Sequence, residues 1–201
     1  MLRMKRNRNW IVVVGAVVAG GVCAGAVIAA QLDERGIPQD LEASLRSDPL
    51  VQVADIPADG GLGRRGVFVQ QTPAGFLCLW DAPNASSRAR QGGCNDADDP
   101  FGGRELFLSL AYDGGPAVAD VRDARLIGLV STEVPEVAVL MSDGSRRKVN
   151  LRKASIGDDS YQAFGYRFKS SDLRRGIAPT AVLALNDAGE EVDRQPTGFA
   201  G

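Results

Sequence analysis

The N-terminal part of the chain is dominated by an uninterrupted apolar run from Trp10 to Ala30. This run follows a short basic leader, and no charged residue occurs between Arg8 and Asp33. A helix of this length covers roughly 30 Å, the thickness of the hydrocarbon core of a bilayer. The pattern therefore predicts a transmembrane helix over residues 10–31, with Trp10 as an anchor at the membrane interface.

Basic residues on the N-terminal side of this segment set its predicted orientation. Because positive charge is retained in the cytoplasm, we expect the leader 1–9 inside and the rest of the chain outside. The topology determinants are Arg3, Lys5, Arg6 and Arg8. A cleaved signal peptide has the same basic start, and cleavage near Ala29 or Ala30 would instead give a secreted protein. The apolar run exceeds the roughly 7–15 residues of a signal-peptide core, which favours a retained anchor.

Two small residues within the anchor, Gly21 and Gly25, lie one helical turn apart. Such a pair lets two transmembrane helices approach closely and dimerise. A segment rich in alanine and glycine also contains such pairs by composition alone, and we favour that interpretation.

Residues 32–65 are interpreted as a juxtamembrane helix followed by a linker. Apolar residues recur every four positions at Ile37, Leu41 and Leu45, and the segment from Pro57 to Gly63 is rich in glycine. We therefore place the start of the folded domain at Gly66.

From Gly66 onward the apolar residues alternate with a period of two, and turn signals come at short intervals. Val67–Gln71 and Phe76–Trp80 form one predicted hairpin, and Asp143-Gly144 is the turn of another. Phe164, Tyr166 and Phe168 alternate onto one face of a further strand, and Asn186–Gly189 is the turn of a closing hairpin. The segment from Ala82 to Gly103 is polar and is expected to be a loop. These elements are Val67–Gln71, Phe76–Trp80, Leu106–Tyr112, Arg125–Ser131, Val134–Met141, Arg146–Leu151, Tyr161–Phe168, Thr180–Leu185 and Glu190–Arg194.

Many short strands without an intervening long helix predict an antiparallel β-sandwich over residues 66–195. A division into two smaller β lobes at residues 118–124 is the alternative, because the strand signal is weakest there. Residues 196–201 are a C-terminal tail.

Composition narrows the function. The chain has a net charge of −2, and without the four basic residues of the leader the remaining 19 basic and 25 acidic residues give −6. An acidic exported domain is a poor partner for nucleic acid. The absence of histidine excludes Ser-His-Asp and Cys-His catalysis and His-ligated zinc, but not carboxylate chemistry. No cofactor is expected.

The three cysteines are divided by the predicted topology. Cys23 lies in the membrane segment, which leaves Cys78 and Cys94 as the pair in the exported part. An oxidising compartment permits a disulfide between them, and we predict that bridge.

Acidic residues offer two further candidate sites. Asp96, Asp98 and Asp99 could contribute oxygen ligands to a metal, although the glycine and glutamate of an EF-hand loop are missing, which favours a solvated loop. A glycosidase would need two converging carboxylates, and the candidates are Asp81, Glu105, Asp113 and Asp123. Nothing in the sequence pairs them, and turns use aspartate for backbone hydrogen bonds. Trp80 is expected in the core rather than stacked on a sugar.

The segment from Leu126 to Arg194 resembles the Ig-like extracytoplasmic β-sandwich domains of single-pass exported proteins in high-GC Gram-positive bacteria. The resemblance is carried by Gly128-Leu129-Val130, Val137-Ala138-Val139, Asp143-Gly144-Ser145 and Leu185-Asn186-Asp187-Ala188-Gly189-Glu190. Phe76-Leu77-Cys78-Leu79 and Gly92-Gly93-Cys94 are similar to a cysteine-containing hairpin upstream in such proteins. The resemblance implies a fold and a location, and no activity.

The sequence thus favours a membrane-anchored, non-enzymatic protein that binds or scaffolds at the cell surface. Its expected partners are the lipid bilayer of the plasma membrane and a cell-surface protein or glycan. The alternative is a small exported glycan hydrolase that uses carboxylates. A signal-transducing membrane sensor is disfavoured, because a leader of nine residues cannot fold into a cytoplasmic domain.

Overall fold

The computed structural model describes residues 12–13, 49–114 and 118–199. This part of the chain is built almost entirely of strands, with one short helix and one 3-10 turn. Its strands are β1 (Val12–Val13), β2 (Val51–Ile56), β3 (Arg65–Gln71), β4 (Phe76–Ala82), β5 (Gln91–Asp96), β6 (Leu106–Gly114), β7 (Val121–Val130), β8 (Glu136–Met141), β9 (Arg146–Val149), β10 (Arg152–Ile156), β11 (Asp159–Arg167), β12 (Pro179–Leu185) and β13 (Glu191–Pro196). The helix is α2 (Ser170–Arg174) and the 3-10 turn is η1 (Val118–Asp120).

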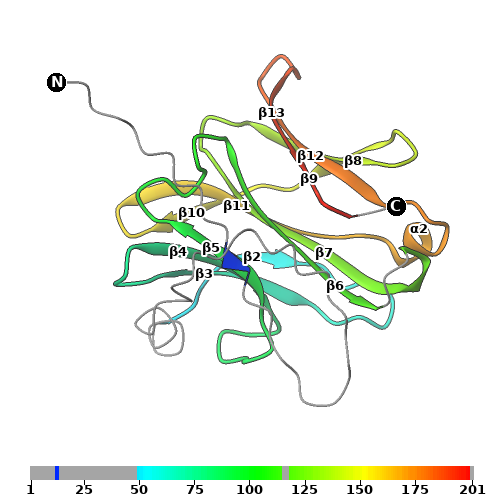
Figure 1. Ribbon diagram of the computed structural model, residues 1–201, viewed down its shortest axis with the longest axis horizontal. Helices are drawn as coiled ribbons and strands as arrows, with labels where there is room; N and C mark the ends of the chain where they lie inside the picture. The colour runs from blue at the N-terminus through cyan, green and yellow to red at the C-terminus, as the bar shows by residue number, and fades with distance from the viewer. Residues whose placement is uncertain (1–11, 14–48, 115–117, 200–201) are drawn as a thin grey trace, which may run out of the picture.

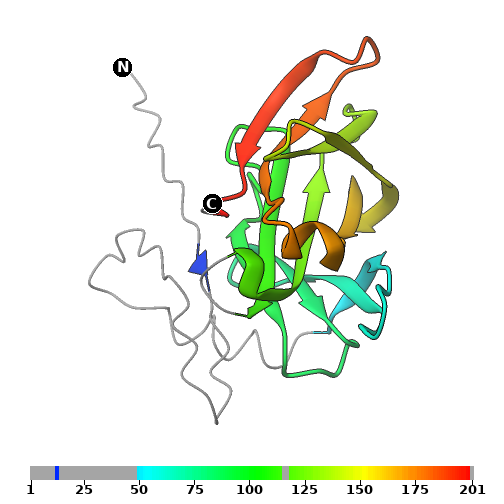
Figure 2. The same cartoon turned by 90° about the vertical axis from the view of Figure 1, so that its right-hand side faces the viewer.

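The strands form three antiparallel sheets that are stacked face to face (Figures 1 and 2). The first, which we call the disulfide sheet, has the order β1-β5-β4-β3-β2. The central sheet has the order β10-β11-β7-β6, and the C-terminal sheet has the order β13-β12-β8-β9. The predicted mainly-β, antiparallel architecture is confirmed, with three sheets where the sequence suggested two.

The central sheet is buried on both faces, which explains the third layer. Along β7, Leu126 and Val130 enter a core shared with the C-terminal sheet, whereas Ile127 and Leu129 enter a core shared with the disulfide sheet. A strand whose two faces are both apolar must be covered on both sides. Two hydrophobic cores therefore lie on either side of one sheet.

The turn residues in the sequence correctly predicted the positions of three hairpins. The β3–β4, β8–β9 and β12–β13 hairpins all form at the predicted turns. Phe164 and Tyr166 of β11 and Phe168 just after it share one face, as predicted, and pack into the core beneath the C-terminal sheet.

Two expectations about the domain limits need correction. The folded unit begins before Gly66, because β2 pairs antiparallel with β3 and buries Ala54 and Ile56. The possible division at residues 118–124 does not separate two lobes, since β6 and β7, on either side of it, are neighbours in the central sheet.

The predicted polar loop from Ala82 to Gly103 is also partly wrong, because it contains β5. Gly92 of this strand lies so close to β4 that an added Cβ would stand 1.8 Å from the Leu79 carbonyl oxygen. Close approach of two backbones therefore explains a glycine-rich strand without apolar alternation.

Several sequence predictions lie outside the described residues. These include the leader 1–9, the juxtamembrane helix and most of the segment 10–31. Val12–Val13 is described and differs from the helix predicted there, because it forms the edge strand β1, which pairs with Gly93 and Cys94 of β5. Among the described residues no helix is long and apolar enough to cross a bilayer.

The disulfide and central sheets lie in close contact at Gly165 of β11. A Cβ at this position would lie 2.6 Å from Ile56 Cγ1 and 2.8 Å from the Asp55 carbonyl oxygen. The absent side chain thus lets β2 cross directly over β11.

We expect Gly165→Ala to lower the free energy of unfolding by about 1–3 kcal/mol, because the added methyl group overpacks this crossing. Gly61→Ala is the matched control, since nothing lies within 4 Å of a Cβ there. Urea unfolding of both variants measures the difference. Equal stability of the two variants would contradict the close approach of the sheets.

Candidate functional site

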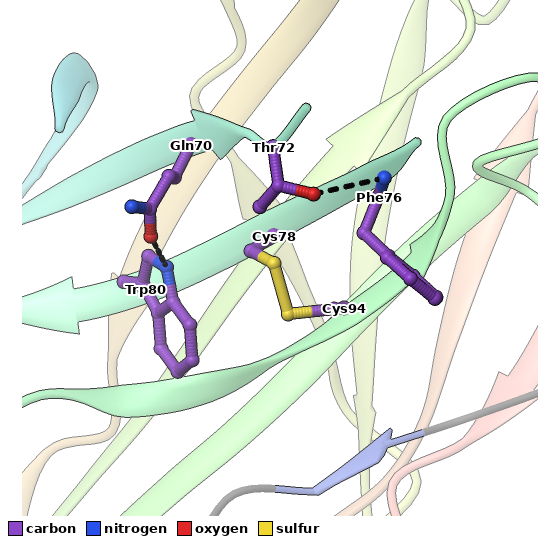
Figure 3. Close-up of a disulfide and its surroundings, with 6 residues drawn as sticks. All are labelled: Gln70, Thr72, Phe76, Cys78, Trp80 and Cys94. Atoms are coloured by element: carbon purple, nitrogen blue, oxygen red, sulfur yellow. Dashed lines mark hydrogen bonds between the residues drawn. A yellow bond between two sulfur atoms is a disulfide. The ribbon is translucent and has the colours of Figure 1, made fainter. Parts of the chain in front are cut away.

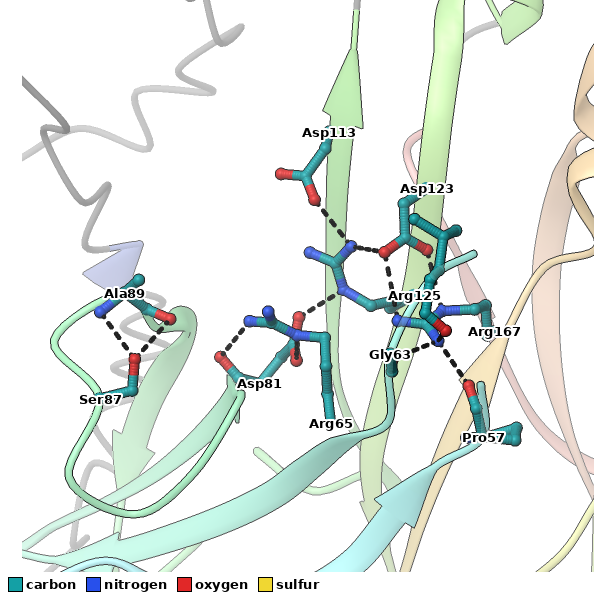
Figure 4. A network of polar contacts seen from close by, with 11 residues as sticks. Pro57, Gly63, Arg65, Asp81, Ser87, Ala89, Asp113, Asp123, Arg125 and Arg167 are labelled. Carbon is teal, nitrogen blue, oxygen red and sulfur yellow. Dashed lines mark hydrogen bonds and ion pairs between the residues drawn. The ribbon is translucent and has the colours of Figure 1, made fainter. Parts of the chain in front are cut away.

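Three of the four carboxylates considered as a catalytic set do come together in the structure. Asp81 at the end of β4, Asp113 at the end of β6 and Asp123 on β7 all contact one guanidinium, that of Arg125 (Figure 4). Glu105 does not join them, because it precedes β6 at the other end of that strand.

Arg125 on β7 is the centre of this group. Its Nε donates to Asp81 Oδ2 at 2.6 Å, and its terminal nitrogen donates to Asp113 Oδ2 at 2.9 Å and to Asp123 Oδ2. The same face of β7 carries Ile127 and Leu129, so the ion pairs extend the core between the disulfide and central sheets.

Two further arginines continue the group in opposite directions. Arg65 of β3 donates from Nε to Asp81 Oδ1 at 2.5 Å, and Arg167 of β11 donates from Nε to Asp123 Oδ1 at 3.0 Å. We call these six residues the ion-pair chain: Arg65, Asp81, Asp113, Asp123, Arg125 and Arg167. It joins strands of two sheets and balances three positive charges with three negative ones.

Arg167 also holds the loop between β2 and β3. Its terminal nitrogen donates to the carbonyl oxygens of Pro57 at 2.6 Å and Gly63 at 2.8 Å (Figure 4). The ion-pair chain thus ends at backbone carbonyl oxygens, which accept hydrogen bonds from the remaining donors of the buried Arg167 guanidinium.

The charges of the ion-pair chain are largely removed from water, which costs free energy unless each charge is paired. Asp81 is fully buried, and Arg125 retains only 1% of its exposed surface. Burial alone would lower the pKa of Arg125, but the carboxylates of Asp81 and Asp113 outweigh burial and raise it. Charges removed from water persist only when they are paired and hydrogen-bonded, and here each buried charge is.

This arrangement does not provide a pair of catalytic carboxylates. A glycosidase needs one carboxyl group that donates a proton and a second that attacks or activates water across a cleft. Asp81 and Asp123 instead accept hydrogen bonds from two guanidinium groups each and lie in the interior. Only Asp113, with 58% of its side chain exposed, faces solvent.

A related contact positions α2. Asp59 Oδ2, in the β2–β3 loop, accepts hydrogen bonds from the Ser170 backbone N–H at 3.1 Å and its hydroxyl at 2.7 Å. The residue that precedes the helix, Lys169, makes no side-chain cap. These two bonds from Ser170 lower the pKa of Asp59.

The predicted disulfide is present between Cys78 of β4 and Cys94 of β5, which are directly opposite in the register (Figure 3). Trp80 lies beside it on the outer face of the same sheet, where its Nε1 donates to Gln70 Oε1 at 3.2 Å. Only 2% of Trp80 is exposed, so its predicted place in the core is confirmed and its ring face is not open to a sugar.

The carboxylates of Asp96 and Asp99, two of the three metal-ligand candidates, accept hydrogen bonds from backbone N–H groups of their own loop. Asp96 Oδ1 accepts from the Asp98 N–H at 3.0 Å, and Asp99 Oδ1 accepts from the Gly103 N–H at 3.1 Å. In the described part of the chain, no three side chains of histidine, cysteine, aspartate or glutamate are grouped to hold a metal ion.

Comparison with known proteins identifies no relative. No protein-family model matches the chain, and no curated protein or solved structure matches it.

The arginines of the ion-pair chain were missed by sequence reasoning. A usable signal was present in β7, where Asp123 and Arg125 alternate onto the same face as the apolar Ile127 and Leu129. Charged residues in register with core residues indicate a buried ion pair. Asp81, the other buried partner of Arg125, is 44 residues away from it and has no local signature.

We expect Arg125→Met to destabilise the fold by about 3–5 kcal/mol, because it leaves Asp81 and Asp123 buried with too few partners. Asp113→Asn removes the exposed member of the same group and should cost less than about 1 kcal/mol. Chemical denaturation of both variants tests this contrast. Similar small losses for the two would show that Arg125 does not carry the chain.

A second prediction concerns pH. Since the pKa of folded Asp59 is below its ordinary value, its contribution to stability is complete above about pH 4 and is lost as the pH falls through the lowered pKa. Asp59→Ala should therefore be less stable than the unmodified protein at pH 7, by about 1 kcal/mol or less because the carboxylate is partly exposed. The gap should narrow as the pH falls below about 4, as thermal unfolding at several pH values would show. Asp98→Ala, at an exposed carboxylate, is the control, and a gap independent of pH would refute the assignment.

Proposed function

We propose that this protein is a membrane-anchored, extracytoplasmic β-sandwich protein with a non-enzymatic binding or scaffolding role at the cell surface. The proposal rests on how the candidate catalytic carboxylates are paired in the structure. Asp81 and Asp123, the buried members of the candidate catalytic set, are neutralised by arginines. Together with the absence of histidine, this favours binding over acid–base catalysis.

The location is supported by two independent features. The apolar segment 10–31 and the basic leader before it have the pattern of a single-pass anchor with the N-terminus in the cytoplasm. The Cys78–Cys94 disulfide is of the kind that persists in oxidising compartments outside the cytoplasm. Both features favour an exported domain, and cleavage near Ala29 or Ala30 would make it a secreted one.

The Ig-like part of the proposal concerns the segment from Leu126 to Arg194. It supplies β8, β9, β12 and most of β13 to one sheet, and the second half of β7 together with β10 and β11 to the facing one, around a single core. In an immunoglobulin domain the second strand joins the sheet of the first and fifth strands. Here the corresponding strand, β8, pairs with β12, so the proposed likeness lies in the number and layering of strands rather than in their order.

The alternative function, a carboxylate-dependent glycan hydrolase, would have to use Asp113. Its carboxylate is the exposed member of the ion-pair chain. Incubation of the purified full-length protein with polysaccharides tests this alternative. Turnover that Asp113→Asn abolishes would replace the binding proposal.

We expect alkaline phosphatase, which is active only where its own disulfides form, to be active when fused after Gly201. Membrane fractionation should recover the fusion in the membrane, and N-terminal sequencing should begin at Met1. The matched control lacks residues 10–31 and should be inactive and soluble, because nothing directs it across the bilayer.

An inactive full-length fusion would contradict the proposed topology. Activity in the medium, with a mature N-terminus near Ala30 or Gln31, would establish the secreted form. Reduced Cys78 and Cys94 in the purified protein would remove the second support for export.

A further inference from the structure

Charge is strongly segregated within the folded part of the chain. Residues 144–178 contain nine basic and three acidic residues, whereas the rest of 49–199 contains eight basic and seventeen acidic ones. The basic residues of this segment are therefore an exception in an acidic domain.

Five of them gather around one end of the molecule, which we call the basic end: Arg146, Arg147, Lys169, Arg174 and Arg175. The Arg147 and Arg175 guanidinium groups both pair with Asp172, at 3.6 and 2.5 Å, so β9 and α2 are adjacent. The turn before β9 is also bonded to the segment that joins α2 to β12, since the Ser142 N–H donates to the Ala178 carbonyl oxygen at 2.8 Å.

The cations of the basic end exceed the carboxylates near them. Asp172 is buried beneath its two arginines, and the nearby carboxylates Asp59 and Asp143 accept hydrogen bonds from serines. Glu191, which interacts electrostatically with Arg146, is paired with Arg194. Lys169 and Arg174 are exposed and have no ion pair among the described residues. The Nε of Arg147 is buried and has no hydrogen-bond partner among the described residues.

The basic end lies far from Pro49, the first residue of the described range 49–114. Pro49 lines the same surface hollow as Ser155 and Gly157, next to the start of β11. The helix α2 follows the other end of β11, which at ~3.3 Å per residue is about 30 Å away.

We infer that the basic end is a binding surface for a phosphodiester polymer of the cell envelope that extends away from the membrane. Guanidinium groups form paired hydrogen bonds with phosphate oxygens, and four of the five cations are arginines. The distance from Pro49 favours a polymer over the headgroups of the anchoring bilayer. This inference deepens the proposed function and rests on its extracytoplasmic location.

The test uses the full-length protein in nanodiscs of neutral phosphatidylcholine and measures its binding to long-chain inorganic polyphosphate by light scattering or calorimetry. We expect binding that weakens steeply with salt, as counterion release requires. Lys169→Ala with Arg174→Ala should weaken it about tenfold or more and lower the salt slope by about two.

The matched control is Arg88→Ala with Lys153→Ala, which removes the same charge from exposed sites outside the basic end. This control should bind within about twofold of the unmodified protein, because long-range charge is screened. Unchanged thermal midpoints establish that both variants are folded.

Three outcomes would overturn the inference. The first is an equal loss of polyphosphate affinity in both double variants, which would reflect net charge alone. The second is the absence of binding to polyphosphate, and the third is that the protein binds anionic lipid vesicles or polyglutamate in preference to polyphosphate. None of them bears on the topology, which the phosphatase fusion decides independently.

Discussion

The structure depends on the position of Arg125 between two sheets. Its guanidinium meets Asp81 from the disulfide sheet and Asp123 from the central sheet, and all three side chains are buried. An unpaired charge there would be costly, so β4 and β7 can pack only in the register that brings the three side chains together. Arg167 extends this constraint to the β2–β3 loop, and through Asp59 that loop positions α2.

Basic residues have opposite roles at the C-terminal end of β11 and just beyond it. Arg167, at the end of the strand, is buried and matched by Asp123, so its charge holds the sheets together. Lys169 and Arg174, only a few residues further on, are exposed and form no ion pair within the described part of the chain. The chain therefore uses its arginines first to specify the fold and then to create a positive surface. The net charge of the chain is negative, so it reveals neither the buried ion pairs nor the exposed positive surface.

Sequence reasoning reached the parts of the fold that are local. The hairpin turn at Asp143-Gly144 needs only a glycine at positive φ, which Gly144 supplies at 80°. The strand β5 was missed because its glycines are required by the neighbouring strand, a contact with no trace in the alternation of its own residues. The ion-pair chain was missed for the same reason, since Asp81 and Arg125 are 44 residues apart. Apart from the disulfide, which the cysteine count predicted, the features that depend on one segment were predictable, and those that depend on contacts between two segments were not.

The length of β11 has a consequence for any partner of the basic end. If the chain leaves the bilayer through residues 32–48 and enters the domain at Pro49, the cations around α2 stand about 30 Å beyond that entry. At physiological ionic strength a surface charge is screened over about 8 Å. Attraction between the basic end and the lipid surface is then negligible in an upright domain. A partner for these arginines has to reach them from the envelope, which is why a flexible polyanion fits this surface better than the membrane does.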